Sequence, residues 1–195
     1  MADDDFEDRD REIRRLLRAG QRKQANALVV ETYGEKLLRY VRGHAPSGAD
    51  LGDLEDASWE GIFRGLPRFP EDVPIIALVI GVARHRVADA FGASAHDALP
   101  SHLSEVRALF PGGRSGPTSP SAAVQREERI EQVRRALAQL REEDRELLDL
   151  RWVQDLKPKA IAHVLGGGVR PNAISQRIVA AGKRFTALWD SESVR

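Results

Sequence analysis

The sequence predicts an all-α protein of two small helical domains joined by a flexible linker. Apolar residues recur at three- and four-residue steps through most of the chain, and no convincing alternating strand pattern occurs. Residues 93–122 are instead rich in Gly, Ser, Pro and Ala and carry few charges, so this segment cannot offset its ordering entropy by burial. We therefore expect domains at residues 1–92 and 123–195, with one candidate short helix near residues 102–110 of the linker.

The first domain is predicted to contain a helix pair followed by two further helices. The pair runs through the charged opening segment and is broken near Ala19-Gly20. The next helix extends from Asp53 to Leu66. Its broad apolar face is formed by Leu54, Ala57, Trp59, Ile62, Phe63 and Leu66. The last helix begins at about Pro74, a favoured first-turn residue. The run from Ile75 to Ile80 alone also fits a buried strand, but the apolar residues up to Phe91 stay in helical phase.

The second domain is predicted to contain two helices, a short helix and a long final helix. The first two have the sequences EERIEQVRRALAQL and EEDRELLDLRWV, and the acidic residues that open the second suit the positive end of a helix. The short helix runs from Pro158 to Leu165 and the long one from about Pro171 to Trp189. Apolar residues at steps of four and three predict the buried face of the long helix: Ile174, Ile178, Ala181, Phe185 and Leu188.

Three glycines, Gly166 to Gly168, separate the last two helices. No predicted strand precedes them and no Gly-Lys-Ser/Thr follows, which disfavours a phosphate-binding loop. A helix C-cap at Gly166 explains the same residues without a ligand. We expect these glycines to end one helix and to set the angle of the next.

The exposed face of the long helix is predicted to be polar and basic. A short helix, a Gly-containing turn and a helix with such a face form the helix-turn-helix arrangement, whose second helix enters the major groove. Asn and Gln side chains can pair with adenine and Arg with guanine, while Lys183 and Arg184 are placed to hold phosphates. An ordinary solvated helix face is the alternative interpretation. The predicted base-reading residues are Arg170, Asn172, Ser175, Gln176 and Arg177.

Charge and composition exclude several classes of protein. Residues 1–91 carry 14 Lys and Arg against 17 Asp and Glu, and residues 118–195 carry 14 against 11, so the second domain is the better candidate for nucleic acid. The chain has no Cys and no catalytic or metal-ligand spacing, so we expect no enzyme activity, no metal and no cofactor. The acidic start is unlike a signal peptide, and the longest apolar run is too short to span a bilayer. We expect a cytoplasmic protein without membrane insertion.

Both predicted domains resemble one known family. The segments that carry the resemblance are IRRLLRAGQRKQANALVVETYGEKLLRYVRGH, DLGDLEDASWEGIFRGLPRF and ARHRVADAF in the first domain, and ALAQLREEDRELLDLRWVQDLKPKAIAHVLG and VRPNAISQRIVAAGKRFTALW in the second. In this order and spacing they resemble the extracytoplasmic-function sigma factors of bacterial RNA polymerase. The resemblance implies promoter recognition and opening of the minus-ten element by the first domain, with the minus-thirty-five element bound by the second.

The resemblance also implies partners and site residues. Core RNA polymerase would be bound through its beta-prime clamp and beta flap, with Asp50, Asp53 and Asp56 at the clamp-facing positions. Arg84, His85 and Arg86 match the helix that faces minus-ten DNA, and Arg68 to Pro74 match the loop that captures an unstacked base. An anti-sigma factor is a further implied partner.

The chain departs from the family pattern at several positions. Ile75, Ile76 and Leu78 stand where the family tends to have aromatic residues and Arg, and the usual basic run after Phe91 is missing. Ala180 and Gly182 stand where basic residues are common. These departures leave a second hypothesis: a degenerate sigma-like adaptor that binds polymerase or an anti-sigma factor without initiating transcription.

Overall fold

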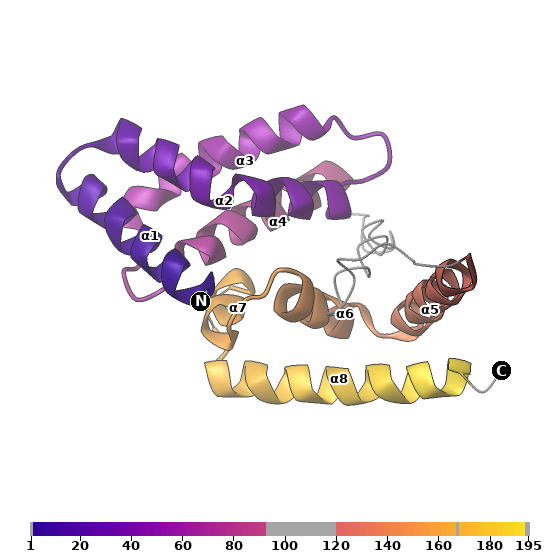
Figure 1. The fold of residues 1–195 in the computed structure, drawn as a ribbon. Coiled ribbons are helices and arrows are strands. Elements are labelled where there is room, and N and C mark those ends of the chain that lie inside the picture. Colours follow the sequence, from indigo (N-terminus) through magenta and orange to yellow (C-terminus); the bar gives the residue numbers. More distant parts are fainter. Residues whose placement is uncertain (1, 93–119, 167, 194–195) are drawn as a thin grey trace. The chain divides into compact units, whose positions relative to one another are not determined.

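The computed structural model describes residues 2–92, 120–166 and 168–193, and it confirms the all-α prediction (Figure 1). Among these residues every regular element is helical. The predicted linker lies largely outside the described residues, as does the candidate helix near residues 102–110. The chain divides into two compact units. The first contains α1 to α4 together with residues 162–169, and the second contains α5, α6, the start of α7 and α8.

The first unit is built from α1 (Ala2–Arg18), α2 (Arg22–His44), α3 (Leu51–Gly65) and α4 (Ile75–Phe91), with a short 3-10 helix at Leu66–Arg68. α2 packs against each of the other three helices. The predicted break between α1 and α2 is confirmed, because Gly20 adopts a φ of +73°, a left-handed conformation that favours glycine. The amide of Gln21 donates to the carbonyl of Leu16 at 2.9 Å, which closes the end of α1.

α4 confirms the predicted helix and shows that the strand alternative is wrong. The helix follows Pro74, and its apolar residues form one buried stripe: Ile75, Ala77, Val79, Ile80, Ala83 and Val87. Pro74 favours this start because its ring fixes φ near the helical value.

Asp10 of α1 joins three helices of the first unit. One carboxylate oxygen accepts a 2.5 Å hydrogen bond from the hydroxyl of Tyr33 on α2, and the other accepts a 2.9 Å bond from the amide of Ile75. Arg14, one turn further along α1, donates to the carbonyl of Val73 at 2.6 Å. Burial raises the pKa of the Asp10 carboxyl, although both hydrogen bonds favour its charged form. α1 is therefore fixed to the start of α4 by polar contacts as well as by packing.

α3 and α4 approach closely at two glycines. A Cβ on Gly61 would lie 2.8 Å from a methyl group of Val82, and one on Gly65 would lie 3.2 Å from a methyl group of Leu78. The buried stripe of α3 is narrower than the predicted apolar face: Leu54, Ser58 and Ile62 are buried, while Trp59 and Phe63 are half-buried and stack on each other. Ser58 is accommodated because its hydroxyl donates to the carbonyl of Leu54 at 2.6 Å.

The second unit is built around α8 (Pro171–Ser193), which packs against α5 (Pro120–Gln139) and α6 (Glu142–Leu148). Its core cluster consists of Val133, Leu137, Leu140, Leu148 and Ala181, with Phe185, Leu188 and Trp189 packed against it. The predicted buried face of α8 is therefore confirmed. α7 (Pro158–Val164) precedes α8 in the chain.

One predicted helix of the second unit is regular only in part. The segment EEDRELLDLRWV forms α6 up to Leu148 and then a π-helical stretch, Asp149–Val153. Four successive residues, 147–150, are buried there. A regular α-helix with one buried face buries residues three and four apart, so this segment is covered on more than one side.

Candidate nucleic-acid interface

The turn before α8 contains a helix cap rather than a phosphate cradle. α7 ends at Val164, and Gly166 adopts a φ of +104° with its amide donating to the carbonyl of His163 at 3.1 Å. This positive φ explains the glycine at position 166, as the sequence predicts. The carbonyl of Arg170 then accepts hydrogen bonds from the amides of Ala173 and Ile174 and so begins α8.

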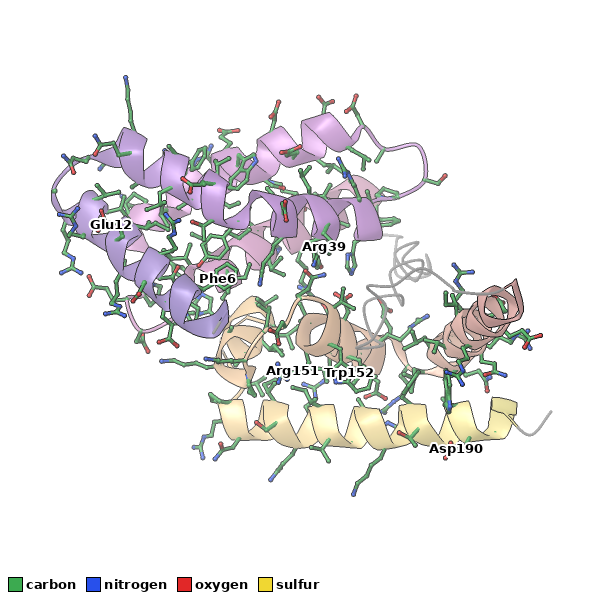
Figure 2. All side chains as sticks on the ribbon, in the orientation of Figure 1. Phe6, Glu12, Arg39, Arg151, Trp152 and Asp190 are labelled. Carbon is green, nitrogen blue, oxygen red and sulfur yellow. The ribbon has the colours of Figure 1, made fainter. Side chains whose placement is uncertain are left out.

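One face of α8 is polar and open to solvent. Asn172, Gln176 and Lys183 are exposed on it, and the half-buried Ser175 donates from its hydroxyl to the carbonyl of Pro171 at 3.1 Å. Val179 lies among them and is 58% exposed. In Figure 2 a row of side chains extends from α8 on the side away from α6. No Asp or Glu occurs from Arg170 to Trp189, so this face presents positive charge and hydrogen-bonding groups without an acid of its own helix.

Arg177 and Arg184 lie on a different side of α8, where they meet the acidic first turn of α6. A guanidinium nitrogen of Arg177 lies 3.2 Å from a carboxylate oxygen of Glu143. Arg184 donates from Nε and Nη2 to the two oxygens of Asp144 at 2.8 and 2.7 Å. Because the two arginines are seven residues apart, nearly two helical turns, they meet two neighbouring acids with the same side of α8. Arg177 and Arg184, which the sequence predicts as contacts to DNA, therefore each have an intramolecular partner.

Asp144 is a buried carboxylate that sequence reasoning missed. Its side chain is 4% exposed, and Arg141 approaches it from the same turn at 3.2 Å. The hydrogen bonds from Arg184 lower the pKa of the Asp144 carboxyl, and Arg141 adds to this effect. The sequence signal for this contact is the triplet Glu142, Glu143 and Asp144 opposite two arginines at seven-residue spacing. In the sequence alone the triplet indicates only favourable charge at a helix N-terminus.

The predicted minus-ten residues lie in the middle of α4. His85 is exposed, Arg84 is half-buried, and Arg86 lies 3.6 Å from the carboxylate of Asp89 one turn later. At the start of α4, Ile75 is fully buried, whereas Ile76 and Leu78 are half-buried. The positions where the family tends to have aromatic residues therefore pack within the first unit.

The predicted polymerase-binding acids occupy the first turns of α3. Asp50 caps this helix, because its carboxylate accepts hydrogen bonds from the amides of Gly52 and Asp53 at 2.8 and 3.2 Å. Asp53 and Asp56 are exposed and lie three residues apart, on neighbouring positions of one helical face. Asp50 thus has a structural role, while Asp53 and Asp56 form a small acidic surface.

Two further classes of site have no counterpart in the part of the chain that the structure describes. No group of three or more His, Asp or Glu residues there is arranged to hold a metal ion. No described helix is both long and apolar enough to cross a membrane.

Comparisons with known proteins connect the chain to one solved fold. No model of a known protein family matches it, and no curated protein matches its sequence. The fold is similar to that of CnrH, solved in complex with the cytosolic domain of CnrY. The TM-score is 0.59 with 18% sequence identity, over 94% of this chain and 98% of the CnrH chain. At this level of identity the similarity concerns the fold.

Proposed function

We propose that this protein is a sigma-type promoter-specificity subunit of bacterial RNA polymerase. The observation that carries the proposal is the exposed face of α8, which joins Asn172, Gln176 and Lys183 on a helix without acids in its first five turns. Amide side chains are suited to adenine in the major groove, and Lys to a phosphate. The similarity to CnrH, an extracytoplasmic-function sigma factor, supports this function.

The proposed division of labour follows the two domains predicted from the sequence. Residues 1–92 bind core polymerase, with Asp53 and Asp56 facing its beta-prime clamp, and present Arg84, His85 and Arg86 to the minus-ten element. Residues 123–195 contact the beta flap and bind the minus-thirty-five element through α8, and residues 93–122 connect the two. An anti-sigma factor is a proposed partner, supported by the complex of CnrH with the cytosolic domain of CnrY.

The geometry distinguishes two groups among the proposed DNA contacts of α8. Asn172, Ser175, Gln176 and Lys183 share the open face and are the proposed contacts to bases and to one phosphate. Arg177 pairs with Glu143 and Arg184 pairs with Asp144. Their first role is therefore to join α8 to α6. To contact DNA, the guanidinium of Arg177 must first leave the carboxylate of Glu143.

Transcription with purified components tests the proposal. The protein is combined with core polymerase, and the complex is used to select bound duplexes from a genomic library and to transcribe them. We expect selection of a common upstream element and transcription that depends on it. The variant Asn172→Ala/Gln176→Ala should lose that selection, whereas Gln24→Ala, which truncates an exposed polar side chain on α2, should keep it. Absence of any promoter-dependent transcript with the unaltered protein would contradict initiation activity.

A polymerase-binding adaptor is the second candidate function. The observation that favours it is the apolar start of α4, where Ile75 is buried and the first turn contains no aromatic residue. A strand-opening assay with a fluorescent base in the minus-ten element separates the two functions. Binding of core polymerase without strand opening at any selected promoter would favour the adaptor.

A further inference from the structure

Val179 is the most exposed large hydrophobic residue in the described part of the chain. Its exposed fraction is 58%, against 41% for Val30 and Leu51. The buried face of α8 runs through Ile174 and Ala181, both fully buried, so Val179 does not contribute to the core. Within a helix Val is also less favourable than Ala, because its branched side chain loses rotamer freedom. Nothing within the second unit therefore requires the two methyl groups at this position.

The side chains that share the open face with Val179 are polar, whereas Trp152, which is 39% exposed, lies against Gly182 three residues further along the helix. Asn172 lies seven residues before Val179, Gln176 three residues before and Lys183 four residues after, which places all of them on one side of the helix. A protein-binding patch would need more apolar surface than Val179 and the exposed part of Trp152 supply. One apolar group between amide and ammonium groups instead matches the major groove, where the thymine C5 methyl lies beside hydrogen-bond donors and acceptors.

We propose that Val179 is a specificity-determining residue whose methyl groups pack on the C5 methyl of one thymine in the upstream element. The inference rests on the proposed binding of DNA by α8. The thymine can be placed along the duplex, because the seven residues from Asn172 to Val179 span about 10.5 Å of helix axis. Base pairs are spaced about 3.4 Å apart and a helix in the major groove is inclined to the duplex axis, so the thymine lies within about three base pairs of the one that Asn172 contacts.

Deoxyuridine substitution tests this contact, because it removes only the C5 methyl and leaves base pairing intact. Duplexes selected by the polymerase complex are prepared with each thymine of the upstream element replaced in turn, and each is bound to the complex containing unaltered protein or Val179→Ala. We expect one thymine whose replacement weakens binding of the unaltered protein about three- to fivefold, the loss typical of one buried methyl group. Val179→Ala should weaken binding to the unmodified duplex by a similar factor.

The combination of both changes gives the decisive result. Replacement of that one thymine should cause little further loss with Val179→Ala, because the partner methyl groups are already absent. Val30→Ala, an exposed valine on α2, is the matched control and should bind like the unaltered protein. The inference is overturned if Val179→Ala weakens binding equally on duplexes with and without that C5 methyl, or if Val179→Ala leaves binding unchanged. In both cases the selected element still supports the proposed function. Failure of the unaltered protein to select any element overturns both.

Discussion

The guanidinium of Arg184 and the carboxylate of Asp144 form an ion pair with two hydrogen bonds, at 2.8 and 2.7 Å. The carboxylate is buried whereas the guanidinium is about half exposed. The pair joins the middle of α8 to the first turn of α6 across 40 residues of sequence. It therefore sets how the proposed DNA-binding helix is held within the second unit.

Arg184→Ala is expected to lower the free energy of unfolding, because it leaves the buried carboxylate of Asp144 with fewer donors. Arg141 remains near Asp144 and limits the loss. Lys183→Ala is the control, since Lys183 is the exposed neighbour on the same helix. Denaturant unfolding of the full chain, followed by tryptophan fluorescence, measures both. Equal stability of the two variants would show that the ion pair contributes nothing to folding.

The contribution of this ion pair is also expected to depend on pH. Because Arg184 lowers the pKa of the folded-state Asp144 carboxyl, the stabilisation is fully present above the unfolded value of about 4 and is lost as the pH falls through the lowered folded pKa. The stability difference between the unaltered protein and Arg184→Ala should therefore be constant near neutral pH and shrink below pH of about 4. Unfolding curves from pH 7 to pH 3 measure it. A difference that persists unchanged at the acidic end would contradict this origin.

The hydrogen bonds of Asp10 give a second stability prediction. Asp10→Ala should cost about 1–3 kcal/mol, since the buried hydroxyl of Tyr33 and the amide of Ile75 both lose their acceptor. Tyr33→Phe, added to Asp10→Ala, should recover part of this loss by removing the unpaired hydroxyl. Asp8→Ala removes an exposed acid from the same helix and is the control. A double-mutant cycle by denaturant unfolding measures the coupling, and strictly additive losses would contradict it.

Glu143→Gln is expected to strengthen binding of the selected upstream element about two- to fivefold, the range for one exposed ion pair. The substitution removes the intramolecular partner of Arg177 and leaves its guanidinium available to a phosphate. Glu142→Gln makes the same charge change one residue earlier and controls for the general effect of a lost acid. Binding titrations at several salt concentrations should show a steeper salt dependence for Glu143→Gln alone. The same gain in both variants would assign the effect to net charge.

The two glycines around the turn should differ in their tolerance of alanine. A side chain at Gly166 meets no atom within 4 Å, so the expected cost of Gly166→Ala, about 1–3 kcal/mol, arises from the φ of +104° alone. Gly168 also has open space around it but no such φ, so Gly168→Ala should be neutral or stabilising by up to about 1 kcal/mol. Thermal unfolding compares the pair. Equal effects would contradict a helix cap at Gly166.

Periodicity and proline placement predict the helices of this chain because those signals are local. Pro74 and the apolar residues of α4 identify the helix start, and the steps of four and three from Ile174 onward identify the buried face of α8. The partners of Asp10 and Asp144 are not predictable in this way. Each acid meets a group 40 or more residues away, and helical spacing assigns a residue to a face without stating what packs there.

Arg177 shows the same limit at the candidate interface. Its position in the sequence, next to Gln176, suggests a shared DNA-reading face. One residue is a rotation of about 100° around the helix, which is enough to move Arg177 from the open face to α6. Composition identifies α8 as basic, whereas only the tertiary contacts distinguish a side chain that is available to a ligand from one that is already engaged.

The hydrogen bond from the amide of Ile75 to Asp10 spans 65 residues of the chain. During synthesis α1 and α2 leave the ribosome first, so Tyr33 is available to one oxygen of Asp10 before the amide of Ile75 is available to the other. A nascent chain that ends before residue 75 contains α1 and α2 but lacks the protein donor to the second oxygen of Asp10. The set of hydrogen bonds to Asp10 is therefore complete only after the first residue of α4 has been made.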